Sequence, residues 1–196
     1  MEREALQPTL FVPMTGKAEA TRKLQPDGAN PEVINGDFET IEKPESGSQA
    51  PLPIDIVAGW YYGRQVAIVQ ENAFEGSGFV RFENKTPDLS SHLLQGIPID
   101  GREITSIRLR GSLRIHDVKP GTQSDSRPSI AISLYDEQRR EVGMHVIGPF
   151  RGTKGWTKHS RLIRLPPQTR EAIVRIGLFG ATGTADFDAV AIDKVN

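Results

Sequence analysis

Hydrophobic and polar residues alternate in short runs along most of the chain after residue 33. The clearest run covers residues 107–116, where the apolar side holds Ile107, Leu109, Leu113 and Ile115 and the other side is polar. A period of two is typical of a β-strand with one face in a core. Gly111, in the middle of the run, predicts a bulge or a bend.

Similar strand-length runs recur with turn residues between them, at residues 65–69, 78–83, 103–118, 129–136, 158–165, 172–180 and 185–193. In the run that starts at residue 129, the apolar residues 130, 132 and 134 alternate with Ala131, Ser133 and Tyr135. No segment after residue 33 has a long helical period, and no internal repeat is visible. The pattern predicts an all-β fold, a two-sheet antiparallel sandwich.

The polar stretch before residue 33 contains prolines, glycine and at most one short helix around residues 17–23. We therefore predict an N-terminal extension or linker over residues 1–32 and one β-sandwich domain over residues 33–196. A chain of 196 residues suits a single sandwich domain. Prolines 44, 51 and 53 exclude regular structure in the stretch between the opening segment and residue 54.

The amino-acid composition excludes several classes of protein and of functional site. The chain has 19 glycines and 14 prolines, which divide the apolar runs into short pieces. Cysteine is absent, which excludes disulfides, a thiol nucleophile and cysteine-ligated metal. No apolar run approaches the roughly 20 residues that span a bilayer, so we predict no membrane insertion. We expect a secreted or periplasmic protein whose leader lies outside this sequence.

Charge gives little support to a nucleic-acid partner. The net charge is −1, and residues 56–196 carry fifteen acids and nineteen bases without a concentrated basic stripe. Arginine outnumbers lysine by sixteen to eight, and arginine suits planar hydrogen bonding to carboxylates, sulfates or vicinal hydroxyls. The alternative is that these arginines form ordinary solvated ion pairs. Oligomeric state is not predicted.

Three segments, taken in order, resemble jelly-roll carbohydrate-binding modules of the group related to families 4, 9, 16 and 22, within the galactose-binding-like sandwich class. They are "VINGDFE" at 33–39, Gly59-Trp60 followed by "GSGFVRFEN" at 76–84, and the closing stretch 152–193, with Gly155-Trp156 before a strand and an aspartate in the last strand. The resemblance implies that residues 33–39 form the opening strand beside the last strand. It also implies a non-catalytic module that binds a poly- or oligosaccharide, accessory to a secreted carbohydrate-active system.

The resemblance further implies a structural calcium ion. Glu39 and Asp188 would share it with backbone carbonyls, since carboxylates and carbonyl oxygens suit this hard cation. Phe38 would point inward while Asp37 and Glu39 face away. The alternative is that both acids are solvent-facing residues of edge strands. The final strand departs from the family pattern of paired acids, because Ala189 follows Asp188 and Asp186 lies two residues earlier.

Modules of this group bind glycans by stacking aromatic rings on sugar faces. We expect Trp60 and Trp156 to be buried, and we predict that the tyrosines contact the sugar. The polar side of residues 107–116 would bond sugar hydroxyls or acidic groups if it faces the ligand, and would be a solvated surface otherwise. The candidate carbohydrate-binding residues are Tyr61, Tyr62, Tyr135, Arg108, Arg110, Arg114 and His116.

Catalytic patterns are missing from the sequence. The four histidines, at 92, 116, 145 and 159, lack metal-ligand spacing, and Glu137 and Glu141 belong to a hairpin-turn pattern. Serine-hydrolase, zinc-protease and phosphate-loop signatures are absent. We predict a non-enzyme. Two alternatives stay open: a structural or protein-interaction sandwich without glycan binding, and, more weakly, part of a glycoside hydrolase or lyase.

Overall fold

The computed structural model describes residues 27–42, 56–124 and 126–195. The predicted short helix at 17–23 and most of the proline-containing loop lie outside these residues. All regular structure in the described part is β-strand. The strands are β1 Ile41–Glu42, β2 Ile56–Val57, β3 Val66–Val69, β4 Phe79–Asn84, β5 His92–Pro98, β6 Ser106–Lys119, β7 Ser129–Tyr135, β8 Glu141–Ile147, β9 Gly152–Arg164, β10 Glu171–Gly177 and β11 Thr182–Val195.

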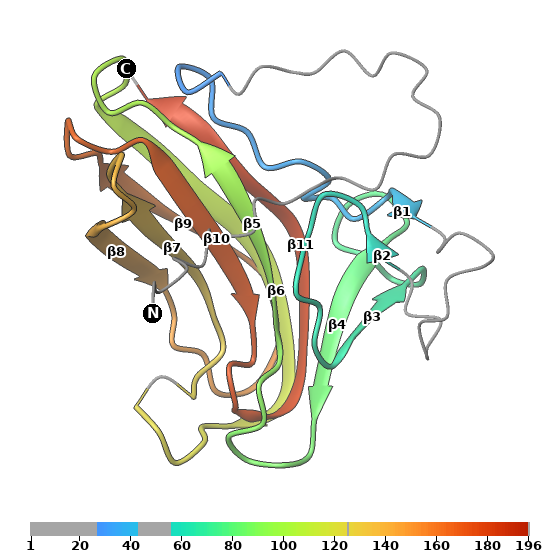
Figure 1. Ribbon diagram of the computed structural model, residues 1–196. Helices are drawn as coiled ribbons and strands as arrows, with labels where there is room; N and C mark the ends of the chain where they lie inside the picture. Colours follow the sequence, from blue (N-terminus) through green and yellow to red (C-terminus); the bar gives the residue numbers. More distant parts are fainter. Residues whose placement is uncertain (1–26, 43–55, 125, 196) are drawn as a thin grey trace, which may run out of the picture.

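The long strands form two antiparallel sheets that pack face to face (Figure 1). One sheet has five strands in the order β3-β4-β11-β6-β9, and the other has four in the order β5-β10-β7-β8. β1 and β2 form a separate small pair. The predicted two-sheet antiparallel sandwich is confirmed. Consecutive strands alternate between the sheets at several points, which is how a jelly roll encloses one core.

Alternation in β6 places its side chains as the sequence predicts. Ile107 and Leu109 are fully buried, and Arg108 and Arg110 are exposed on the opposite side. The same holds in β7, where Ile130, Ile132 and Leu134 point into the core. Burial of these aliphatic side chains and of four fully buried phenylalanines is the main source of stability, at about 25 cal/mol per Å² of apolar surface. Those phenylalanines are Phe38, Phe79, Phe82 and Phe187.

Two strands of the four-stranded sheet were not among the predicted runs. β5 contains Gly96 and ends at Pro98, and β8 contains Gly143, so each lacks the β-branched alternation that marks a strand. Their places in the sheet come from pairing with β10 and β7. β9 also begins at Gly152, earlier than the apolar run at 158–165 predicts.

The prediction of an opening strand at residues 33–39 is wrong, because residues 34–37 form a turn. Asn35 and Phe38 both have positive φ, which a strand excludes. The Asn35 side chain bonds across the turn: its Oδ1 accepts from Thr40 N at 3.0 Å, and its Nδ2 donates to the carbonyl oxygens of Thr40 and Ala58. A polar side chain that satisfies the backbone locally competes with a sheet ladder.

The opening turn nevertheless lies beside the last strand, as predicted. Val190 N donates to Gly36 O at 2.8 Å. The register between β6 and β11 shifts at this point, because Ser112 pairs with Asp188 whereas Arg110 pairs with Ala191. One residue of β6, Gly111, therefore faces two residues of β11. The bulge predicted at Gly111 is formed by the partner strand, and it aims Val190 N at the turn.

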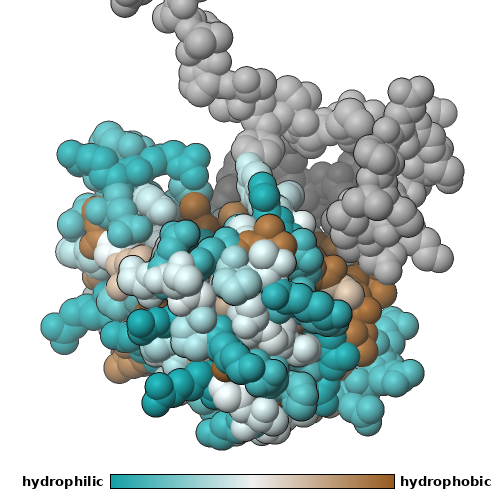
Figure 2. Space-filling model, turned by 90° about the horizontal axis from the view of Figure 1, so that it is seen from below, coloured by the Kyte–Doolittle hydropathy of each residue, from teal (hydrophilic) through white to brown (hydrophobic). Residues whose placement is uncertain are grey.

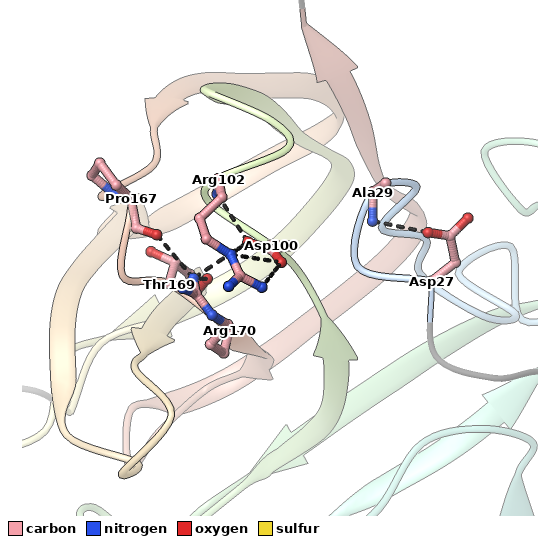
Figure 3. A network of polar contacts seen from close by, with 7 residues as sticks. All are labelled: Asp27, Ala29, Asp100, Arg102, Pro167, Thr169 and Arg170. Atoms are coloured by element: carbon pink, nitrogen blue, oxygen red, sulfur yellow. Dashed lines mark hydrogen bonds and ion pairs between the residues drawn. The ribbon is translucent and has the colours of Figure 1, made fainter.

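Polar residues lie at both ends of the sandwich. At one end the Asp100 carboxylate accepts hydrogen bonds from Arg102 and pairs with Arg170, which in turn donates to the carbonyl oxygens of Pro167 and Thr169 (Figure 3). Hydrogen bonds from Arg102 hold the pKa of Asp100 well below its usual range. The other end, seen in Figure 2, presents a largely hydrophilic surface with apolar patches toward its margins.

Candidate functional site

One open surface of the described residues is the outer face of the four-stranded sheet, meaning the face turned away from the core. Register defines it, because directly paired residues of antiparallel strands point to the same side. One row across the sheet contains Leu94, Arg175, Ala131 and Val146 on β5, β10, β7 and β8. Tyr61 extends this row, since it exchanges backbone hydrogen bonds of 2.8 and 3.1 Å with Leu94 at the sheet edge.

Small side chains make the floor of this outer face. β7 contributes Ser129, Ala131 and Ser133, all buried although they point away from the core. Arg175, on the neighbouring strand β10, donates from Nη2 to Ser133 Oγ at 2.9 Å and contacts Met144 Sδ at 3.9 Å. Small residues on β7 therefore leave room for one long cationic side chain at the centre of the face.

A hollow of about 780 Å³ lies over one end of this face. Its walls come from the loops that join β4 to β5, β6 to β7, β8 to β9 and β10 to β11. Arg161 reaches it from the five-stranded sheet and donates from Nη1 to Val146 O at 2.7 Å. The lining residues that matter for chemistry are Asp88, His92, Arg127, Arg161, Arg175 and Phe179. A hollow of this size is in the range of small-molecule sites.

His92 and Phe179 form a flat aromatic pair in the hollow. Their ring centroids lie 5.8 Å apart with an interplanar angle of 8°. Burial lowers the pKa of His92, and the positive charges of Arg64 and Arg175 lower it further. The imidazole is therefore neutral at pH 7. Its Nδ1 lies 3.0 Å from Ser90 Oγ, which leaves Nε2 for a ligand beside an apolar ring.

The structure places the predicted tyrosines in two kinds of position. Tyr61 is 57% exposed at the β5 edge of the outer face, and Tyr135 ends β7 on the same face. Tyr62 is 59% exposed and has positive φ, so both neighbouring tyrosines reach solvent. From the register, Tyr61 and Tyr135 are separated by roughly 13 Å along the strands and roughly 14 Å across them.

The predicted arginine stripe lies elsewhere, on the outer face of the five-stranded sheet. Arg114 and Arg81 both bind the buried carboxylate of Asp186, at 2.7 Å each. Arg110 pairs with Asp193 at 2.8 Å. Arg108 and His116 are exposed on the same side of β6. The structure therefore does not bring the stripe together with Tyr61 and Tyr135, and the two groups occupy opposite faces of the sandwich.

The two tryptophans behave differently from each other. Trp60 is buried, as expected, and packs on Phe38 with ring centroids 5.6 Å apart. Trp156 is only half-buried, so the expectation of burial is wrong for it. It lies on the outer face of the five-stranded sheet, where its ring packs edge-on against Phe79 and the Arg114 guanidinium lies 4.7 Å from its centroid. The cation–π contact with Arg114 stabilises the Trp156 ring in place of burial in the core.

Glu39 and Asp188 hold the same loop. Glu39 accepts hydrogen bonds from Ser77 N and Gly78 N, and Asp188 Oδ2 accepts from Phe74 N at 2.8 Å and Glu75 N at 3.0 Å. Phe38 is buried in the core, as predicted. The pKa of Glu39 is lowered by the Ser77 hydroxyl and these amides, whereas burial raises the pKa of Asp188.

This arrangement does not fit calcium as it stands. A cation needs bare oxygen lone pairs, whereas these carboxylates already face N–H hydrogens. Among the described residues, no group of three or more acidic or histidine side chains gathers around one point. Calcium at Glu39 and Asp188 stays a prediction, and thermal unfolding across a calcium titration tests it.

Arg175 and Phe179 were missed by sequence reasoning, and His92 was seen but given no role. Arg175 is the polar residue of a strand that is otherwise apolar. The same kind of alternation in β6 selected the arginines of that strand as candidates, and β6 belongs to the other sheet. Phe179 lies in a turn with positive φ, where no pattern predicts its direction. Only the pairing of β5, β10 and β7 brings these three residues together.

Comparison with known proteins bears on the fold. No protein-family model matches the chain, and no curated protein matches it. Among solved structures, a family 16 carbohydrate-binding module superposes with a TM-score of 0.55 at 15% identity, over 83% of this chain and 99% of the module. The chain has the jelly-roll fold of such modules. At this identity the likeness concerns the fold alone.

Two longer proteins contain the same jelly-roll fold. The family 22 and GH10 modules of the Clostridium thermocellum xylanase 10B, complexed with xylohexaose, match with a TM-score of 0.50 at 17% identity, over 70% of this chain and 26% of that one. The enzymatically active domain of bacteriophage CBA120 tailspike protein 4 matches with a TM-score of 0.52 at 15% identity, over 70% of this chain and 20% of that one. Within its described part, this jelly roll contains no helix suited to crossing a membrane.

Proposed function

We propose that the protein is a non-catalytic module that binds a poly- or oligosaccharide across the outer face of the four-stranded sheet. The observation that carries the proposal is the placement of Tyr61, Arg175 and Tyr135 on one sheet face, over a floor of small side chains. A sugar ring has an apolar C–H face and a rim of hydroxyls. Flat aromatic rings and guanidinium donors match these two parts.

The module would act beside a carbohydrate-active system outside the cytoplasm, where polymeric glycans are found. Two known proteins with this fold support the proposal by what they are: one is a carbohydrate-binding module, and another carries xylohexaose. The roughly 19 Å diagonal between Tyr61 and Tyr135 suits an extended chain of several sugar units better than a single monosaccharide.

Isothermal titration and affinity electrophoresis against plant, algal and bacterial glycans test the proposal. We expect binding to at least one polymer, and we expect Tyr61→Ala and Tyr135→Ala each to weaken it about three- to tenfold, because an aromatic stacking contact contributes about 0.5–1.5 kcal/mol. Leu162→Ala is the control, because this exposed side chain lies on the outer face of the five-stranded sheet, and it should change affinity less than twofold. Absence of binding to every glycan would remove the function and leave the fold intact.

A further inference from the structure

Among the described residues that line the hollow, positive charges outnumber negative ones. Its cationic side chains are Arg127, Arg161 and Arg175, and Asp88 is the acid among its lining residues. The Asp88 carboxylate is already engaged: Oδ1 accepts from Thr122 N at 2.9 Å and from Ser126 Oγ at 2.8 Å. The hydroxyls of Thr122 and Ser126 lower the pKa of Asp88, and these bonds turn its oxygens toward the loop. This acid therefore fixes a wall of the hollow and does not itself neutralise the arginines.

Arg175 and Arg161 are positioned by neutral partners. Arg175 is held by the Ser133 hydroxyl and by Met144, and its buried Nε has no acceptor among the described residues. Arg161 is held by a backbone carbonyl. Neither forms an ion pair with an acid in the described part of the chain. Hydrogen bonds of this kind fix a guanidinium in place without cancelling its charge.

The five-stranded sheet provides an internal contrast. On its outer face Asp186 neutralises Arg81 and Arg114 in part, and Asp193 pairs with Arg110. Arginines with carboxylate partners have fewer free donors and a weaker field for a ligand. The hollow therefore gathers arginines whose charge no acid among the described residues neutralises.

We propose that the hollow binds a negatively charged sugar unit, so that the ligand is an acidic glycan. Its carboxylate or sulfate would accept hydrogen bonds from Arg175 and Arg161, and its ring would lie near the flat His92–Phe179 pair. The two oxygens of a carboxylate, or two of a sulfate, match the fork of a guanidinium. This inference rests on the proposed glycan-binding function and names the class of glycan.

Affinity electrophoresis tests it with four polymers: polygalacturonate for carboxylates, dextran sulfate for sulfates, and galactan and dextran as neutral counterparts. We expect binding to one or both charged polymers that exceeds binding to the neutral ones. Arg175→Gln should weaken this binding at least about tenfold, because hydrogen bonds to charged groups are the strong ones. The carboxylated and sulfated arms show which anion is preferred.

Arg110→Gln is the matched control, since it removes the same charge from an exposed arginine that already has a partner. It should change affinity less than twofold, and thermal unfolding should show that both variants are folded. Equal binding of charged and neutral polymers, or charged binding that Arg175→Gln leaves unchanged, would overturn the inference while the proposed function stands. No binding to any polymer, including a wider glycan panel, would instead remove the proposed function itself.

Discussion

At the scale of single residues, carboxylates in this protein hold backbone amides. Asp188 is fully buried in the last strand, and its two oxygens accept from the amides of Phe74, Glu75 and Ala189. Glu39 does the same for the other half of that loop. The Asp188 carboxylate, at the bulge, thus accepts hydrogen bonds that the backbone of the irregular loop cannot make in a β-sheet.

Asp188→Ala should therefore lower the free energy of unfolding by about 2–4 kcal/mol, because several amides lose their acceptor at once and cannot all reach water. Chemical denaturation of the variant measures this loss. Asp37→Ala is the control, since Asp37 is exposed on the same turn, and its effect should stay within about 0.5 kcal/mol. Equal effects of the two substitutions would mean that the amide bonds contribute little.

At the scale of elements, the contact between the opening turn and β11 decides how the chain ends meet. Gly36 is tightly enclosed here: a Cβ on it would lie 1.8 Å from Val190 O. Gln95 supports the turn from β5, accepting from Ile34 N at 2.7 Å and donating to Ile34 O. The turn is thus fixed to both sheets, although it belongs to neither.

We expect Gly36→Ala to destabilise the fold by about 2–3 kcal/mol, since backbone on both sides of the contact must move apart to admit a methyl group. Gly155→Ala serves as the comparison, because a Cβ at Gly155 meets nothing within 4 Å and should change stability by no more than about 0.5 kcal/mol. Urea unfolding of both variants measures the difference. A Gly36 variant as stable as wild type would contradict the close packing of turn and strand.

At the scale of the whole molecule, histidines and carboxylates both make the folded state more stable at neutral pH than in acid. His92, His145 and His159 have lowered pKa values, mainly because burial disfavours the charged ring. The loop acids Glu39, Asp88, Asp100 and Asp136 also have lowered pKa values, in their case through hydrogen bonds to hydroxyls, amides and arginines. In both sets, the unfolded chain binds protons more readily than the folded one.

Stability should therefore fall in two steps as pH decreases. The histidine contribution is lost below about pH 6.5, where unfolded imidazoles gain protons, and the contribution of the loop acids is lost below about pH 4, as pH falls toward their folded pKa values. Asp188 acts in the opposite sense, because burial raises its pKa and protonation favours the folded state. Melting temperatures measured from pH 3 to pH 7 test this order. A higher melting temperature at pH 4 than at pH 7 would contradict it.

Local pattern was enough to predict the fold class, the two-sheet sandwich and the inward faces of β6 and β7. Period-two alternation is a property of neighbouring residues, so it can be recognised without knowing which strands pair. β5 and β8 escaped prediction because glycines interrupt their alternation, and the opening turn was mistaken for a strand because Asn35 and Phe38 adopt positive φ. These features depend on partners far away in the chain.

In the candidate site, too, some features could be predicted from local sequence and others depended on distant partners. Sequence alone named Tyr61, Tyr62 and Tyr135 as ligand-facing candidates, together with the polar stripe of β6, and gave Arg175 no role. Which arginines keep an unpaired charge was decided by tertiary structure, since acids on β11 reach Arg110 and Arg114 whereas no acid pairs with Arg175 in the described residues. Charge balance is set by neighbours in space, and a linear sequence does not contain those neighbours.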